Sequence, residues 1–251
     1  LTTALLAQKT NYTLTAPPNG ADTSGLTVRP DKDEATFTSR RWFDFAAGTR
    51  TIGIPLTDAG RVLTLTGADG VARYDAGAGA YVIDKAVGGA EEIQQVPGMG
   101  YFAKFNAART AYFDGDPLAS PVAFNAPAGW SIISPPRNIT LGNTNPAISY
   151  AWYYDGTGYV LKANIPAGGL NVVDDKLDAW KGYFIKRAAA GNVQIGTAQA
   201  NAAPISFGDD AKLVQLVASA GDLADSMNFC GIGGDAVEIA NPPLVDGAVD
   251  L

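Results

Sequence analysis

Short apolar segments separated by glycine, proline and aspartate run along most of this chain. Alternation of apolar and polar positions, as in Tyr12-x-Leu14, is typical of a strand with one buried face. The segment 35–56 predicts a strand, a turn at Gly48 and a second strand, and 61–66 predicts a further short strand or edge. Because no long amphipathic helix is visible, the pattern predicts an all-β protein.

An internal repeat of about 80 residues is the clearest long-range feature of the chain. The matched landmarks are Pro55 and Pro135, Tyr74-Asp75 and Tyr154-Asp155, Gly88-Gly89 and Gly168-Gly169, and, after a slip of two positions, Gly100-Tyr101-Phe102-x-Lys104 and Gly182-Tyr183-Phe184-x-Lys186. A duplicated unit of this length completes its apolar face by stacking on its neighbour. We therefore predict two stacked sandwich-like modules that arose by duplication, over 35–120 and 121–251, preceded by an N-terminal strand and loop segment over 1–34.

Several further elements follow from local patterns. The sequence predicts hairpins over 73–81 and 153–159, strands over 121–124 and 129–134, strands at each Gly-Tyr-Phe-x-Lys, strands over 192–196 and 212–218, and a last strand from Ala248. Pro135 and Pro136 are expected to end the strand over 129–134, because proline cannot donate to a ladder. The stretch 220–243 is predicted to be an irregular loop with short helical turns.

Charge and composition exclude two classes of partner. The chain of 251 residues has 18 basic and 25 acidic residues and a sequence pI near 4.5. It contains no basic run that could follow a phosphate backbone, so nucleic acid is not an expected partner. Its 47% hydrophobic content is sufficient for a core, but no window approaches the roughly 18 consecutive apolar residues of a membrane span.

The residues that usually carry catalysis are scarce. The chain has no histidine, which removes the commonest general base and metal ligand, and its single cysteine, Cys230, lies in an apolar, glycine-rich stretch. Cys230 is therefore expected to be a small buried apolar residue rather than a nucleophile. A carboxylate pair is the one remaining catalytic arrangement, and no two acids are marked as paired. The sequence predicts a protein that is not an enzyme and that carries no cofactor.

Three sets of residues have a functional and a structural interpretation. The aromatic residues Tyr74, Tyr101, Tyr154, Tyr183 and Trp130 could contact a sugar, but packing in the core is the expected role. The glycines Gly77, Gly79, Gly156 and Gly158 are expected to be hairpin turns, because no phosphate-loop sequence follows them. The acidic groups Asp114-Gly-Asp116, Asp209-Asp210 and Asp222, Asp225, Asn228 and Asp235 could bind Ca²⁺, but they lack EF-hand spacing and are expected to cap turns, the last being the best calcium candidate.

Two strand motifs resemble those of a known group of proteins. Gly129-Trp-Ser-Ile-Ile-Ser-Pro-Pro and Trp180-Lys-Gly-Tyr-Phe-Ile-Lys are similar to the GWNLIGNP-type and GKGYWV-type strands of β-rich modules in large secreted bacterial surface proteins. Weaker likeness covers 51–56, 97–102 and a tail over 225–243, while Ser131 and Ser134 stand where that pattern often has Asn and Gly. The resemblance implies export and display at the cell surface or in an extracellular assembly, with no chemistry to transfer.

The expected function is that of a structural subunit in an extracellular filament or surface layer. We expect an extended N-terminal segment to pair with an open sheet edge of another copy of the chain, in a head-to-tail homopolymer. The expected interface residues are Leu5, Tyr12, Leu14 and Ala16. Leu1–Gln8 resembles the end of a secretory signal, and the chain is expected to be a processed product or part of a longer one. The alternative is an adhesin or carbohydrate-binding module with glycans as partners, either through exposed rings or with Ca²⁺.

Overall fold

The structure is a computed structural model in which almost all regular structure is antiparallel strand. The described residues are 21–22, 26–27, 36–37, 40–58, 60–85, 92–165, 172–198, 205, 212–220, 223–232 and 239–243. Within these ranges helix is limited to one short α-helix and one 3-10 turn. The prediction of an all-β protein is confirmed.

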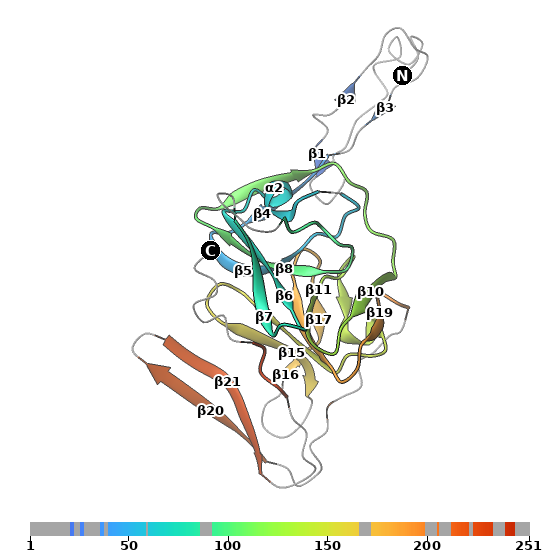
Figure 1. The fold of residues 1–251 in the computed structure, drawn as a ribbon. Helices are drawn as coiled ribbons and strands as arrows, with labels where there is room; N and C mark the ends of the chain where they lie inside the picture. Colours follow the sequence, from blue (N-terminus) through green and yellow to red (C-terminus); the bar gives the residue numbers. More distant parts are fainter. Residues whose placement is uncertain are drawn as a thin grey trace, which may run out of the picture.

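The first half of the body consists of a three-stranded and a four-stranded antiparallel sheet (Figure 1). The three-stranded sheet has the order β1-β4-β9, with β1 Ala21–Asp22, β4 Arg40–Phe45 and β9 Arg109–Phe113. The four-stranded sheet has the order β5-β8-β6-β7, with β5 Gly48–Gly53, β6 Gly70–Asp75, β7 Ala80–Lys85 and β8 Gly100–Phe105. Strands β4 to β9 are called the first repeat. Its predicted turn at Gly48 and its hairpin are confirmed.

The second half repeats this arrangement with extra edge strands. The central sheet has the order β11-β18-β14-β15-β16, with β11 Gly129–Ile133, β14 Tyr150–Tyr154, β15 Tyr159–Ile165, β16 Val172–Asp174 and β18 Tyr183–Arg187. The outer sheet has the order β10-β19-β13, with β10 Val122–Ala126, β13 Thr144–Asn145 and β19 Gly191–Ile195. A 3-10 turn, η2 Leu141–Asn143, and a small sheet of β12 Ile139–Thr140 and β17 Lys176–Leu177 complete it. Strands β10 to β19 are called the second repeat.

Strand pairing places equivalent residues of the two repeats in the same register. Tyr101 lies opposite Ile52, and Tyr183 lies opposite Ile133. Phe102 pairs with Ala72, as Phe184 does with Trp152. In this register Pro55 corresponds to Pro136, one position beyond the Pro135 expected from spacing alone. The two strand orders coincide, whereas descent from a duplication stays a prediction, as do the module boundaries.

One expected strand is wrong. The segment 61–66 forms a one-turn helix, α2 Val62–Thr66, and only Arg61 makes a strand-like bridge, to Gln94. The Thr66 hydroxyl donates to the Val62 carbonyl at 2.8 Å, and Gly67 ends the helix in the left-handed region at φ 64°. The apolar alternation was too short to distinguish one helical turn from a strand.

The Gly-Tyr-Phe strands are buried on both faces because each belongs to a central sheet. In β8, Tyr101 enters the core of the first repeat, between its two sheets, and Phe102 points the other way. In β18, Tyr183 and Phe184 divide between the core of the second repeat and the same shared cluster. The Phe102 and Phe184 ring centroids lie 5.8 Å apart. The repeats therefore stack through their central sheets, with an outer sheet on each side.

Contacts across this junction are reciprocal. Gly53 N–H donates to the Trp180 carbonyl at 2.9 Å, and the equivalent Ser134 N–H donates to the Gly98 carbonyl at 2.8 Å. Gly100 faces Gly182 so closely that a Cβ on Gly100 would lie 2.9 Å from the Gly182 Cα. Each repeat therefore contributes the same positions to the junction, and the backbone hydrogen bond between them occurs twice, once in each direction.

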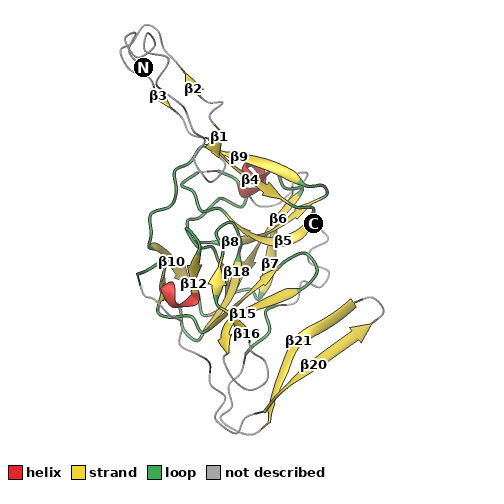
Figure 2. Cartoon of the chain, turned by 180° about the vertical axis from the view of Figure 1, so that it is seen from behind, coloured by secondary structure: helices red, strands yellow, loops and turns green. Residues whose placement is uncertain are grey.

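Two pairs of strands lie beyond the stacked repeats. The pair β2 Leu26–Thr27 and β3 Thr36–Phe37 projects beyond one end, and the hairpin of β20 Lys212–Ala220 and β21 Leu223–Ile232 lies beyond the other (Figure 1). The view from behind shows the same separation (Figure 2). The expected loop over 220–243 is therefore wrong where β21 forms, because cross-strand pairing with β20 organises residues that show no clear alternation. The predicted strand from Ala248 lies outside the described residues.

Candidate ligand-binding clefts

The structure places only some of the predicted site residues. The expected interface residues Leu5, Tyr12, Leu14 and Ala16 lie outside the described residues, and so do Asp209, Asp210, Asp222 and Asp235. The core role expected for the aromatic residues is confirmed for Tyr101 and Tyr183, whose exposure is 0%. The hydroxyls of these two tyrosines accept 2.7 Å hydrogen bonds from the backbone N–H groups of Val96 and Asp178, respectively. Tyr74, Tyr154 and Trp130 are partly buried around the shared cluster.

A cleft of about 240 Å³ opens where the first repeat meets the Tyr-Asp turn of the second. Its walls come from 43–46 at the end of β4 and 50–52 in β5 on one side, and from 153–155 and 180–181 on the other. Tyr154 N–H donates to the Thr51 hydroxyl at 3.0 Å, which joins the two walls. We call this space the first cleft. It has groups from both repeats, so neither repeat forms it alone.

Aromatic side chains form one wall of the first cleft. The rings of Phe43 and Trp180 are stacked, with centroids 4.7 Å apart and planes 13° apart. Phe113 supports Trp180 from the core, at 4.9 Å. Since Phe43 and Trp180 are both partly buried, they are held in place by packing and still reach the cleft.

The backbone of Trp180 is in an unusual conformation. Its φ is 69°, and it is the only non-glycine residue with positive φ among those described. The left-handed region costs an L-residue about 1–2 kcal/mol. At the equivalent position the first repeat has Gly98, with φ 79°. The junction therefore requires this conformation twice, and only the second repeat places a large ring there.

Basic groups lie beside the aromatic wall. Arg50 Nη2 donates to the Ala47 carbonyl, at 2.6 Å, and its Nε is buried without a hydrogen-bond partner in the described part of the chain. Lys181 Nζ lies 2.9 Å from an Asp178 carboxylate oxygen and 4.7 Å from the centroid of the Tyr153 ring. The cleft therefore combines aromatic rings with two cations, and two carboxylates, Asp44 and Asp155, also line it.

The Tyr-Asp turn closes the cleft with a carboxylate already engaged by its own loop. Asp155 Oδ1 accepts from the N–H groups of Thr157, at 2.8 Å, and Gly158, at 3.1 Å. Burial alone would raise the pKa of Asp155, but these hydrogen bonds outweigh burial and hold the pKa below its ordinary value. The first repeat has the same turn, in which Asp75 Oδ1 accepts from Gly77 and Ala78. These bonds fit the expectation that the glycines of both hairpins serve as turns.

The reciprocal junction produces a second cleft at equivalent positions, with a volume of about 170 Å³. Phe124 takes the place of Phe43, and Tyr74-Asp75 that of Tyr154-Asp155. The second cleft lacks the tryptophan ring and the two cations of the first cleft. Gly98, Met99 and Ser131 stand where the first cleft has Trp180, Lys181 and Arg50. The second cleft is smaller, and the basic residue that lines it, Arg73, is paired with Asp75 at 3.4 Å.

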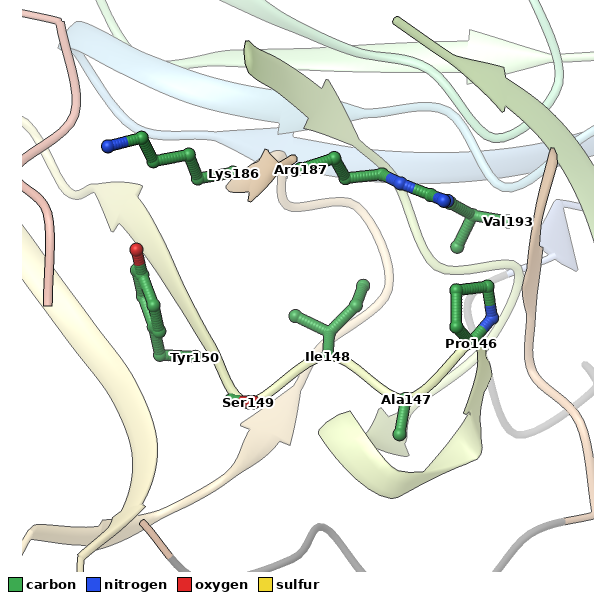
Figure 3. A pocket seen from close by; sticks show the side chains of 8 residues that line it. All are labelled: Pro146, Ala147, Ile148, Ser149, Tyr150, Lys186, Arg187 and Val193. Carbon is green, nitrogen blue, oxygen red and sulfur yellow. The ribbon is translucent and has the colours of Figure 1, made fainter. Parts of the chain in front are cut away.

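A third cavity, of about 220 Å³, belongs to the second repeat alone. Figure 3 shows Lys186 and Tyr150 at one side of it and Arg187 directed toward Val193 at the other. Lys186 Nζ also lies 5.9 Å from the centroid of the Trp130 ring, and Arg187 Nη1 donates to the Asn192 carbonyl at 3.4 Å. Its two cations point apart, so they do not converge on one ligand group.

A C-terminal segment over 239–243 lies against the aromatic edge of the shared cluster. Trp152 Nε1 donates to the Ala240 carbonyl at 3.1 Å, and Tyr159 donates to the Pro243 carbonyl at 2.8 Å. Tyr81 donates to the same Pro243 carbonyl at 3.3 Å. These polar contacts attach the segment to both repeats and satisfy buried ring donors.

The described residues contain neither a metal-binding cluster nor a membrane-spanning helix. In the described ranges, no three acidic or cysteine side chains gather in a group that could hold a metal ion. Of the helices that the structure describes, none has the length and apolar character needed to cross a membrane.

Comparison with known proteins gives no assignment: no family model, no curated protein and no solved structure matches this chain. The resemblance to secreted surface modules stays a prediction.

Sequence reasoning did not single out Phe43, Arg50 or Trp180 as members of one site. Phe43 and Trp180 are separated by more than half the chain and meet only through stacking of the repeats. One signal was present, because aligning the repeats places Trp180-Lys181 against Gly98-Met99. A departure of this kind within an otherwise matched motif marks a position where the repeats differ in task or packing.

Proposed function

We propose that the protein is a non-catalytic structural subunit of an extracellular assembly, a filament or surface layer, joined head to tail by β-strand addition. The observation that supports this most is the placement of two strand pairs, β2–β3 and β20–β21, beyond opposite ends of the stacked repeats (Figure 1). A unit with different elements at its two ends is suited to heterologous contacts, which propagate when they do not close.

The β20–β21 hairpin has the form of a donor element. Its strands pair with each other over most of their nine and ten residues and contribute a separate two-stranded sheet. An isolated two-stranded hairpin is marginally stable in water, and its outer edges are templates for a further strand. Pairing with a sheet of another subunit would supply the missing strands.

The outer sheet at the opposite end carries a suitable apolar surface. Trp42 and Tyr112 are direct cross-strand partners on β4 and β9, with exposures of 39% and 52%. With Val96, at 40%, they are the large apolar side chains that the described residues expose. Paired exposed rings on a sheet face are typical of protein contact surfaces. We propose that the donor strand pairs at the β9 edge of this sheet and packs against these rings.

Two changes to the full chain test the proposal. Replacing both Trp42 and Tyr112 by alanine should leave a folded monomer, since both rings lie on the outer face; Val96→Ala is the matched control and should still assemble. Deleting residues 212–232, which removes the donor hairpin, should also abolish assembly; a separate deletion of residues 1–16 tests the N-terminal segment that the sequence predicts as a donor. Electron microscopy and sedimentation would report the outcome. A full chain that stays monomeric, or polymers that survive both changes, would refute strand-mediated assembly.

A second candidate function is an adhesin or carbohydrate-binding module. The first cleft favours it, because Tyr154, one of the aromatic residues that could contact a sugar, contributes to a cleft that also contains a stacked ring pair. Glycan binding that is lost in Tyr154→Ala would support this function.

A further inference from the structure

We propose that the first cleft binds a sugar ring carrying a carboxylate, with Arg50 receiving the carboxylate and Trp180 packing against the ring. The inference rests on the second candidate function and names its ligand class. It does not depend on assembly, so loss of filaments and loss of sugar binding are separate outcomes.

The aromatic wall supplies the apolar part of such a site. Binding sites for small molecules combine apolar and aromatic walls with a few placed polar groups. Phe43 and Trp180 form a stacked pair at 4.7 Å, and Phe113 supports Trp180 from behind at 4.9 Å. Rings held in this way need no rearrangement for the parts of them that line the cleft to receive a ligand.

The conformation of Trp180 argues for a role beyond filling space. Strained backbone persists where the surrounding structure holds it, and it clusters at ligand sites. The first repeat fills the same turn with Gly98, which adopts positive φ without strain. The second repeat thus carries a strained tryptophan at a position where the other repeat has an unstrained glycine, and the ring of this tryptophan lines the larger cleft.

Arg50 supplies the charge that selects a carboxylate. A guanidinium has five N–H donors in a planar fork and binds carboxylates through two parallel hydrogen bonds. In the described structure one Arg50 nitrogen donates to the Ala47 carbonyl, while Nε is buried without a partner. Asp155 nearby has its Oδ1 engaged by Thr157 and Gly158. Because Nε is inaccessible, the donors left for an incoming acid are those of Nη1 and the second N–H of Nη2, which form no hydrogen bond within the described residues.

The second cleft provides an internal control. Its Tyr-Asp turn is equivalent, but Ser131 and Gly98 stand in the places of Arg50 and Trp180, and Arg73, which lines it in the place of Tyr153, is already paired with Asp75. If the general shape of the junction were enough for binding, both clefts would serve. If the two substituted positions determine binding, only the first cleft will bind the acid.

The test is titration of the full chain with trigalacturonic acid, followed by calorimetry, with neutral maltotriose as the comparison. We expect saturable binding of the acid with a dissociation constant of about 1 mM or tighter. Arg50→Gln should weaken it about 10- to 100-fold, the range for a lost charge-assisted hydrogen bond. Trp180→Gly should remove binding and relieve the backbone strain, whereas Ser131→Ala in the second cleft should bind like the parent.

Several results would overturn the assignment. Absence of saturable binding, equal binding of maltotriose, or unchanged affinity in Arg50→Gln would each refute it. Loss of binding in Ser131→Ala would place the ligand in the other cleft. Circular dichroism of each variant checks folding, and if Trp180→Gly fails to fold, the partly exposed Arg50 still decides the outcome.

Discussion

Gly100 lies where the central sheets of the two repeats meet, and replacing it with alanine tests that packing directly. An added Cβ would lie 2.5 Å from the Ile132 Cγ2, 2.9 Å from the Gly182 Cα and 2.9 Å from the Ile133 carbonyl oxygen. Two of these three atoms are backbone, so a change of side-chain rotamer cannot remove the conflict. The central sheets would have to move apart.

The expected loss follows from two opposing effects. Overpacking a well-packed interior costs about 1–3 kcal/mol, or more when backbone must shift. A Gly-to-Ala change also lowers the conformational entropy of the unfolded chain, which stabilises the folded state by about 0.4–1 kcal/mol. We expect a net loss of about 2 kcal/mol in the free energy of unfolding. For a chain of this size that corresponds to a fall in Tm of about 4–8 °C.

Gly158→Ala is the matched control. Gly158 has no heavy atom within 4 Å of an ideal Cβ, so the same chemical change there should be neutral or slightly stabilising. Urea denaturation and thermal melting, both followed by circular dichroism, would compare the two variants. If Gly100→Ala is as stable as Gly158→Ala, the close stacking of the repeats is refuted.

Three further predictions concern buried polar groups. Burial tends to raise the pKa of Asp84, but hydrogen bonds from Arg61 and the Ile93 N–H outweigh it and lower the pKa, so its stabilisation should be present above about pH 4 and be lost as pH falls through the lowered pKa. Asp84→Asn should cost about 3 kcal/mol at pH 7, because it removes the buried carboxylate that accepts from Arg61 and from the Ile93 N–H. It should also flatten the acid dependence in urea titrations, and an unchanged dependence would contradict this. Tyr183→Phe should cost about 1–2 kcal/mol, because the Asp178 N–H loses its acceptor, and equal stability would refute that hydrogen bond. Burial raises the pKa of Tyr81 to about 12, so its stabilisation is present below about pH 10 and is lost as pH rises toward 12; stability of Tyr81→Phe compared with the parent across that range checks the sign.

Local patterns were sufficient for most of the strands. Alternation marked β10, in which Val122, Phe124 and Ala126 are buried and the residues between them are exposed. Glycine-containing turns marked both Tyr-Asp hairpins, and prolines marked the end of β11. These signals succeed because they depend on neighbours in the sequence and on a single buried face.

The errors arose where local signals were weak or ambiguous. The apolar spacing of segment 61–66 is compatible with one helical turn and with a short strand. Packing of its buried residues in the core of the first repeat decides between the two. Residues 223–232 show no clear alternation, and only pairing with 212–220 makes them a strand. The candidate site was missed for a related reason, since Phe43, Arg50 and Trp180 lie far apart in the sequence.

The sequence by itself determined the all-β class, the repeated order of elements and the lack of histidine chemistry, because these depend on residue type and short-range periodicity. The tertiary structure alone decided how the two repeats pack against each other and which residues their packing brings together. Stacking the central sheets buries both faces of the Gly-Tyr-Phe strands, brings Gly100 against Gly182 and creates two clefts from equivalent positions. The clefts then differ because Trp180 and Arg50 stand where Gly98 and Ser131 stand in the other. These sequence differences form a site only in the folded protein, because each cleft is lined by residues from both repeats.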